Sequence, residues 1–161
     1  MSDSVAAPAR VARSRFLDGL LPAPDPEPGT PHREFLEAAR ERRLVVQRCG
    51  SCASHQYPGE VLCKRCQSTD VRWIVIPQRG VVYSWVRVWH SGRPEVKART
   101  PYLGVVVDVG LRGVRFVGNL LCDPDTEVEI GAPVVAVFED LDDEIALVQW
   151  EFANDAEATR H

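Results

Sequence analysis

Four cysteines in two closely spaced pairs are the residues of this sequence with the clearest chemistry. Cys49 and Cys52 form one Cys-x-x-Cys pair, Cys63 and Cys66 form a second, and ten residues separate the two pairs. Each such turn directs two sulfurs to one point, and a connection of this length lets the second pair fold back to complete a tetrahedron. The pattern predicts one metal ion held by four thiolates.

The donor set indicates which ion this is and what it does. Four thiolates suit structural zinc (Zn²⁺), with iron or a degenerate, metal-free ribbon as the alternatives. Because the protein fills all four positions, none stays open for a catalytic water, and no catalytic residue is predicted here. Residues 44–75 bury little apolar surface of their own, so metal binding, which contributes on the order of 10–16 kcal/mol in model peptides, should supply most of their stability.

Other reactive side chains fit structural roles better than catalytic ones. Cys122 closes a predicted strand and has no histidine near it in the sequence to act as its base, so a half-buried thiol is expected. His55 lies inside the cysteine module, where four cysteines already suffice as ligands. His90 ends a predicted strand and is expected at the surface.

A short helix should precede the cysteine module. Thr30 offers an N-cap oxygen and Pro31 suits the first helical turn, which predicts a helix over about 31–42. Three apolar residues share one side of it: Phe35, Leu36 and Ala39. This apolar stripe is short, so two interpretations stay open: it docks on a partner protein, or it packs on its own chain.

Short strands follow the cysteine module. The run 81–90 is β-branched or aromatic almost throughout, and a hairpin is expected around the Gly-Leu-Arg-Gly turn at 110–113. A fourth strand is predicted within 128–140 and a fifth over 144–152. Five short strands suit a small closed barrel of the OB type, which leaves no exposed sheet edge.

The expected fold class is therefore mostly β, with an N-terminal helix, a rubredoxin-like zinc ribbon and a five-stranded OB-fold barrel. Five prolines in residues 21–31 favour an extended strap before the helix. The predicted division is a flexible N-terminal strap over 1–30, helix plus zinc ribbon over 31–75, the barrel over 76–152 and a disordered tail over 153–161.

The charge distribution and the number of cysteines indicate which ligands and which cellular compartment suit this chain. The net charge of −4 is divided unevenly, with a balance of +7 in residues 31–100 and −10 in residues 101–161. This distribution suits an anionic ligand on the basic part, although two solvated faces would look the same. The sequence has no apolar run of signal-peptide or membrane-spanning length, so we expect a cytoplasmic protein with reduced thiols and no membrane partner.

Several segments together resemble a known family. LPAPDPEP, FLEAARERRLVVQRCGSCASHQYPGEVLCKRC, GVVYSWVRV, PYLGVVVDV, GNL and IGAPVVAVFED are similar to the zinc-ribbon plus OB-fold proteins of the domain of unknown function 35 family, over about residues 20–151. The resemblance implies a non-catalytic accessory subunit of thiolase-fold enzymes or hydratases that act on acyl-CoA, including sterol side-chain degradation in some bacteria. This sequence departs from the family pattern at Phe35-Leu36, where an aromatic pair is usual, and at Ala53 and Gln67, where glycine often stands.

The first functional hypothesis is such an accessory subunit, in a hetero-oligomer with a thiolase or a lipid-transfer-type aldolase. Aromatic and arginine side chains alternate along one predicted strand and suit an adenine ring and a phosphate, and the next loop adds three cations. The candidate acyl-CoA-binding residues are Tyr83, Trp85, Arg87, Trp89, Arg93, Lys97 and Arg99. The alternatives are a core or partner-facing role for the aromatics and simple solvation for the loop cations.

Two further functional classes fit the sequence less well than an accessory subunit. Trp85, Arg87 and Trp89 would also suit a single-stranded nucleic acid on an OB barrel, but an isoelectric point near 5.6 and the acidic C-terminal part disfavour it. An independent enzyme is disfavoured because the sequence has no GxSxG, HExxH, phosphate-loop or GxGxxG motif. Catalytic residues are therefore expected on the partner.

Overall fold

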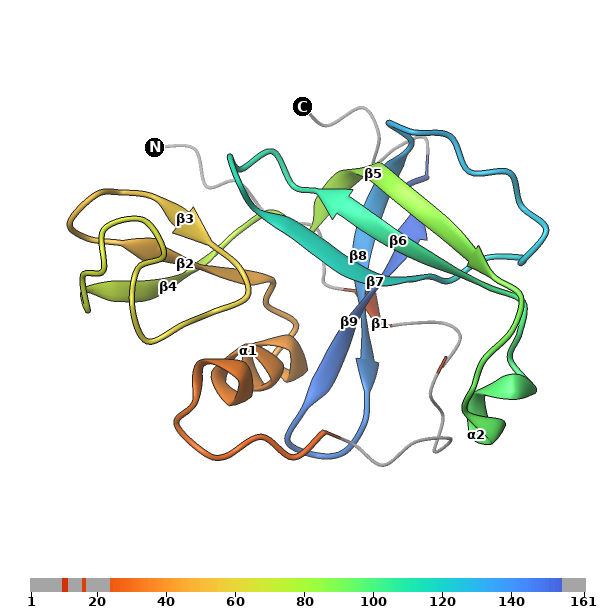
Figure 1. Cartoon of the computed structure of the whole chain (residues 1–161), viewed down its shortest axis with the longest axis horizontal. Coiled ribbons are helices and arrows are strands. Elements are labelled where there is room, and N and C mark those ends of the chain that lie inside the picture. The colour runs from red at the N-terminus through yellow and green to blue at the C-terminus, as the bar shows by residue number, and fades with distance from the viewer. Residues whose placement is uncertain (1–9, 12–15, 17–23, 155–161) are drawn as a thin grey trace.

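The computed structural model describes residues 10–11, 16 and 24–154. The helices are α1 (Pro31–Arg40) and the short α2 (Pro94–Lys97). The strands are β1 (Arg10–Val11), β2 (Val45–Cys49), β3 (His55–Gln56), β4 (Val71–Val75), β5 (Arg79–Val88), β6 (Tyr102–Asp108), β7 (Arg115–Leu120), β8 (Pro133–Asp140) and β9 (Ala146–Phe152). Figure 1 shows the small sheet of β2, β3 and β4 beside a barrel of β5 to β9, with α1 below both.

The barrel closes on itself. Its strands follow the order β8-β5-β6-β7-β9, and an additional β8–β9 pairing completes the ring. The pairings are antiparallel except between β7 and β9, which run parallel and share one residue pair, Leu120 with Trp150. This arrangement confirms the predicted fold class, a mostly β chain with a helix, a ribbon and a five-stranded barrel.

A side chain supplements the barrel where β7 meets β9. The buried Gln149 amide accepts a hydrogen bond from the Asn119 N–H at 2.8 Å and donates one to the Glu139 carboxylate at 2.9 Å. Leu121 adds a main-chain bond, because its N–H donates to the Trp150 carbonyl at 2.8 Å. Closure of the barrel therefore depends partly on a glutamine in the core.

Helix α1 begins as the sequence predicts and ends slightly earlier. The Thr30 hydroxyl accepts the Arg33 N–H at 3.3 Å and caps the first turn. At the other end Arg42 adopts a left-handed φ of 62°, and the Arg43 N–H donates to the Ala38 carbonyl at 2.9 Å. This is a Schellman-type stop formed without glycine, which ends the helix at Arg40.

The apolar side of α1 packs on its own chain. Phe35, Leu36 and Ala39 are only 7%, 2% and 0% exposed, so in the described structure this stripe packs on its own chain, and its part in docking stays a prediction. In the described structure these side chains offer no free surface to a partner, because the barrel and the ribbon already cover them.

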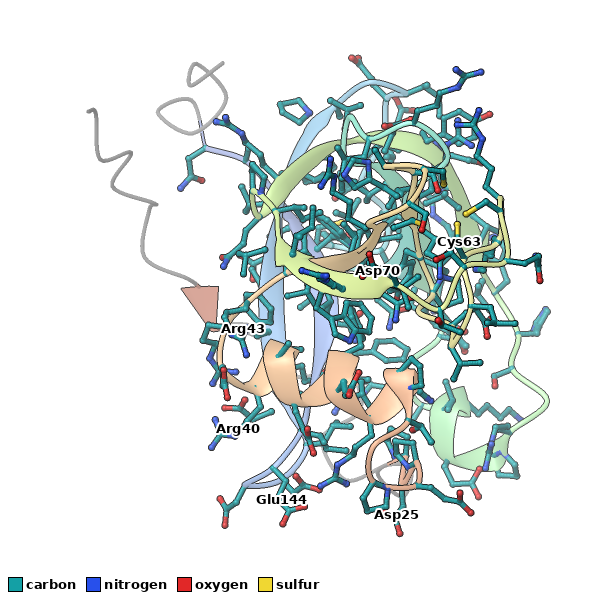
Figure 2. All side chains as sticks on the ribbon, turned by 90° about the vertical axis from the view of Figure 1, so that its left-hand side faces the viewer. Asp25, Arg40, Arg43, Cys63, Asp70 and Glu144 are labelled. Carbon is teal, nitrogen blue, oxygen red and sulfur yellow. The ribbon has the colours of Figure 1, made fainter. Side chains whose placement is uncertain are left out.

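Charged residues line the edge of α1 that faces the β8–β9 turn. Figure 2 shows Arg40 and Arg43 at the C-terminal end of the helix and Glu144 on that turn. Arg33 pairs with Glu144, and Arg42 holds Asp140 with two hydrogen bonds of 2.5 and 2.6 Å. The helix is thus bound to the barrel by ion pairs as well as by apolar contact.

An aromatic cluster joins the helix, the ribbon and the barrel in one core. The Tyr57 ring, from the ribbon, lies 5.0 Å from the Phe35 ring of α1 and 4.1 Å from the Phe116 ring of β7. Burial raises the pKa of the Tyr57 phenol to about 12. The Trp73 indole N–H of β4 also donates to Glu34 at 2.7 Å. The ribbon is therefore fixed to the barrel by packing.

Most of the predicted N-terminal strap and C-terminal tail lies outside the residues that the structure describes. Residues 1–9, 12–15, 17–23 and 155–161 are not described. The division between ribbon and barrel at residues 75 and 76 stays a prediction. Within the described residues, none of the helices is long and apolar enough to cross a bilayer.

Candidate metal centre and predicted ligand residues

Two similar turns carry the four cysteines. In the first, the Ala53 N–H donates to the Cys49 carbonyl at 3.0 Å, and in the second the Gln67 N–H donates to the Cys63 carbonyl at 2.9 Å. Ala53 and Gln67 have positive φ values of 56° and 62°. These are the two positions where a glycine was expected, so the turns adopt the required left-handed backbone without it.

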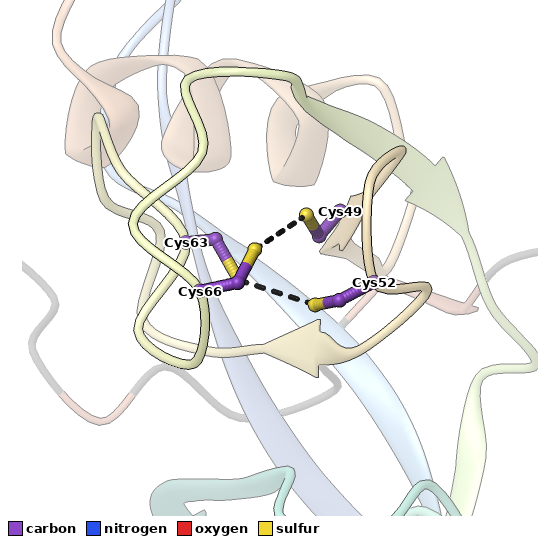
Figure 3. Close-up of side chains that lie close together, drawn as sticks. All are labelled: Cys49, Cys52, Cys63 and Cys66. Carbon is purple, nitrogen blue, oxygen red and sulfur yellow. Dashed lines mark hydrogen bonds between the residues drawn. The ribbon is translucent and has the colours of Figure 1, made fainter.

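The two turns bring four sulfur atoms to one point, as Figure 3 shows. All four lie within 4.8 Å of one another, and the Cys49–Cys66 and Cys52–Cys63 sulfur pairs are each 3.6 Å apart. A zinc–sulfur bond of about 2.3 Å implies tetrahedral sulfur separations of about 3.8 Å. The observed spacing fits one tetrahedral ion, and the four thiolates would hold zinc in a structural role.

A serine hydroxyl prepares the thiols of this site. The Ser54 Oγ lies 3.0 Å from the Cys52 sulfur and 3.4 Å from the Cys63 sulfur. Hydrogen bonding with Ser54, aided by backbone N–H groups, lowers the pKa of the Cys63 thiol to about 6 and also lowers that of Cys52. The thiolate is the form that binds metal, so Ser54 favours that form at Cys52 and Cys63. The neighbouring Cys52 sulfur and partial burial instead raise the pKa of the Cys66 thiol to about 12.

Two buried glutamines connect the cysteine turns, and sequence reasoning missed them. The Gln56 side chain donates to the Gln47 side chain at 2.8 Å and accepts the Lys64 N–H at 2.8 Å. Gln47 also accepts the Glu60 N–H at 2.8 Å. The only sequence signal was a polar residue within each of two short strands, which alternation assigns to the solvent side.

The predicted aromatic row on β5 is broken, which corrects the expectation that its residues share one side. The pairing of β5 with β6 shifts between Val82 and Ser84, so Tyr83 lies in a β-bulge. Tyr83 is 50% exposed and stacks on the Arg115 guanidinium at 3.7 Å, whereas Trp85 packs against the core. Alternation assumes a regular strand, and the inserted residue changes the side on which later residues lie.

Arg87 has a structural environment in the described chain. Its guanidinium donates to the Pro124 and Thr126 carbonyls at 2.7 and 2.9 Å, and lies 5.5 Å from the Trp85 ring and 5.7 Å from the Trp89 ring. These bonds hold the loop before β8. The group expected to bind a phosphate, or a nucleic-acid strand, is thus already engaged.

The other predicted ligand residues lie apart from the cysteines. Arg93, Lys97 and Arg99 are exposed on or beside α2, a short helix where the sequence predicted a loop. Trp89 is 56% exposed. The acyl-CoA-binding role of these residues stays a prediction.

The fifth cysteine and two histidines considered in the sequence lie outside the cluster of four cysteines. Cys122 is half-buried, and partial burial raises the pKa of its thiol, as expected for a residue without an activating base. His55 is half-buried on β3, paired in register with Arg48, and is not among the four clustered ligand residues. His90 is exposed, as predicted.

Comparison with known proteins decides the family. Two family models match, "ChsH2, rubredoxin-like zinc ribbon domain" over residues 36–72 and "ChsH2, C-terminal OB-fold domain" over residues 73–139. The solved structure "Ltp2-ChsH2(DUF35) aldolase" contains a chain that is 31% identical, with a TM-score of 0.69, covering 82% of this chain and 100% of that one. The chain belongs to the ChsH2 family. A second structure, a DUF35-family protein of unknown function from Sulfolobus solfataricus, matches at 13% identity with a TM-score of 0.54, over 78% of this chain and 87% of that one, and supports the fold alone.

Two curated relatives, both named as hydratase alpha subunits, are longer than this chain. The "probable enoyl-CoA hydratase alpha subunit" of Thermomonospora curvata is 34% identical over 113 residues, which is 70% of this chain and 34% of the relative. The "3-oxo-4,17-pregnadiene-20-carboxyl-CoA hydratase alpha subunit" of Mycobacterium tuberculosis is 31% identical over 118 residues, which is 73% of this chain and 36% of the relative. The chain therefore spans about a third of the length of these relatives.

Proposed function

We propose that this chain is a non-catalytic accessory subunit of a thiolase-fold aldolase that acts on an acyl-CoA. The observation that carries the proposal is the match to a chain of the Ltp2-ChsH2(DUF35) aldolase along that chain's entire length. The names of the two curated relatives, both alpha subunits of CoA-thioester hydratases, support an acyl-CoA as the substrate class. A sterol or other lipid side chain is the acyl group that we favour.

The architecture supports a scaffolding role. The zinc ribbon would stand at a fixed position beside the barrel, because Tyr57 packs between the rings of Phe35 and Phe116. In this role the chain stabilises its partner and shapes the channel through which the acyl-CoA enters. Four thiolates would occupy all the coordination positions of a zinc ion, so the metal would contribute rigidity and the reacting groups would belong to the partner.

The ribbon offers a surface for the partner. Val61 and Leu62, between the two cysteine turns, are 70% and 38% exposed. Exposed apolar neighbours of this kind suit contact with another protein. We therefore place the docking surface on the ribbon and on the exposed side of α1.

Co-expression with a thiolase-fold aldolase tests the proposal. The two proteins should co-purify, and retro-aldol cleavage by the partner should be lost when this chain is left out. A purified chain that turned over an acyl-CoA without a partner would contradict the accessory role.

A pair of variants locates the docking surface. Replacing Val61 and Leu62 by Asp should abolish co-purification, because charged groups would have to be buried at the contact. Val117→Asp, at a valine of β7 that is 73% exposed, is the matched control and should leave the complex intact. If only the Val117 variant lost the partner, docking would occur through the barrel instead.

A further inference from the structure

A groove lies where the ribbon meets the barrel. Its volume is about 440 Å³, within the range of small-molecule sites. The ribbon contributes Ser54, His55, Gln56, Tyr57, Lys64 and Arg65, and the barrel contributes Arg112 and Gly113 from the β6–β7 turn. Figure 1 shows this turn extending toward β3 of the ribbon.

The groove is cationic and holds no counter-charge of its own. Lys64, Arg65 and Arg112 are exposed basic side chains, and no aspartate or glutamate lines the groove. Among the described residues, none of these three forms an ion pair with a carboxylate, although Arg33, Arg42 and many other arginines of the chain do. Three cations without a carboxylate partner lie in one hollow of an otherwise acidic protein, and this arrangement favours an anion there.

The walls of the groove are fixed before any ligand arrives. The Tyr57 ring packs against the rings of Phe35 and Phe116. The Gln56 side chain donates to the Gln47 side chain and to the Leu62 carbonyl, and it accepts the Lys64 N–H. The Lys64 ammonium donates to the Pro58 carbonyl at 3.1 Å, which orients it. A preformed site loses little entropy on binding.

Arg112 distinguishes a ligand site from simple charge balance at the metal. Lys64 and Arg65 stand between Cys63 and Cys66, so they also offset the negative charge of four thiolates around zinc. Arg112 belongs to the barrel and is brought to the groove by the β6–β7 turn. The metal site alone does not account for an arginine at this position.

We propose that this groove binds a phosphate-bearing small molecule, with Arg112 of the barrel and Lys64 and Arg65 of the ribbon on the phosphate oxygens. Guanidinium groups form paired hydrogen bonds with phosphate, and an ammonium adds a point charge. The phosphate has two candidate sources, the nucleotide portion of a coenzyme thioester and a free inorganic diphosphate. The coenzyme-thioester source rests on the acyl-CoA substrate class of the proposed function, whereas phosphate binding itself can be measured on the isolated chain without a partner.

Calorimetric titration of the zinc-loaded full chain tests the inference. Adenosine 3′,5′-bisphosphate, inorganic diphosphate and uncharged adenosine are the probes. Both phosphate probes should bind, and their affinity should fall as the salt concentration rises. Adenosine should not bind. Tighter binding of the bisphosphate identifies a nucleotide site, and equal binding identifies a general phosphate site. Absence of binding by both phosphate probes at millimolar concentration overturns the proposal.

Variants assign the binding to the groove. Arg112→Ala should weaken phosphate binding at least about tenfold, and Arg112→Lys should retain part of it. Arg48→Ala, an exposed ribbon arginine outside the groove, removes the same charge and should bind as the unchanged chain does. Zinc content and thermal unfolding verify the fold of each variant.

If Arg99→Ala weakened binding and Arg112→Ala did not, the site would lie beside α2 and the proposal would fail. Co-purification with the aldolase is scored separately, so either proposal can fail alone.

Discussion

Ala53 and Gln67 show how single residues adapt to the metal site. Both follow a ligand cysteine and hold a left-handed backbone, which costs a residue with a side chain roughly 1–2 kcal/mol. Their N–H groups bond to the Cys49 and Cys63 carbonyls, and these bonds keep the turns in the shape that directs two sulfurs to one ion. Local strain here is offset by the geometry of the whole ribbon.

Ala53→Gly should therefore stabilise the zinc-loaded protein by about 0.5–1 kcal/mol, because relief of strain outweighs the added freedom of the unfolded chain. Denaturant unfolding measures the change. Ala38→Gly in the interior of α1 is the control, and it should lower stability by about 1 kcal/mol or more. Equal losses in the two variants would contradict the role assigned to the backbone at residue 53.

Among the elements, the C-terminal end of α1 is held to the barrel through Asp140, which pairs with both Arg42 and Arg40. Arg42→Ala should cost about 1–3 kcal/mol of unfolding free energy, because it removes two charge-assisted hydrogen bonds to a partly buried Asp140. Arg43→Ala, next in the chain, breaks only an exposed pair with Glu41 and should change stability by less than about 0.5 kcal/mol. Paired thermal or urea unfolding curves compare the two variants, and similar losses would argue against this anchor.

The β8–β9 turn should make stability depend on pH. Asp142 accepts the N–H groups of Glu144 and Ile145, both at 2.8 Å, and these bonds lower the pKa of its carboxyl. A carboxyl with a lowered folded pKa stabilises the fold fully above its unfolded pKa, and this contribution is lost as pH falls through the lower folded pKa. Stability should therefore decline on acidification.

Asp142→Asn should flatten that decline, because the amide does not titrate. Unfolding midpoints measured from neutral pH down to about pH 3 report the slope. Asp143→Asn, at an exposed neighbour with no side-chain hydrogen bond in the described structure, should keep the slope of the unchanged chain. A steeper decline in the Asp142 variant would refute this interpretation.

The elements also show what sequence could and could not predict. The helix, the main strands and the cysteine site follow from local signals, namely the Thr30 cap, runs of β-branched residues and Cys-x-x-Cys spacing. The bulge at Tyr83 does not, because it depends on how β5 pairs with β6. The groove was equally inaccessible, since Lys64 and Arg112 are far apart in sequence and meet only in the folded chain.

At the scale of the molecule, ribbon and barrel share one core, with ribbon residues Val45 and Val46 in the same cluster as barrel residues Phe116 and Trp150. Unfolding should therefore be one cooperative transition, and removal of the metal should lower its midpoint. Elemental analysis should find about one equivalent of zinc, and a strong chelator should shift the melting curve. A chain with little metal and an unchanged curve in chelator would refute this prediction.

The glutamine that supplements the β7–β9 contact has a consequence for how the barrel opens. The Asn119 amide is bonded to the side chain of Gln149, so its protection depends on one rotamer in addition to the strands around it. A brief rotation of that side chain would free the amide without separating any two strands. Deuterium uptake at Asn119 should therefore be faster than at its neighbours in β7, marking the place where solvent first enters the protein.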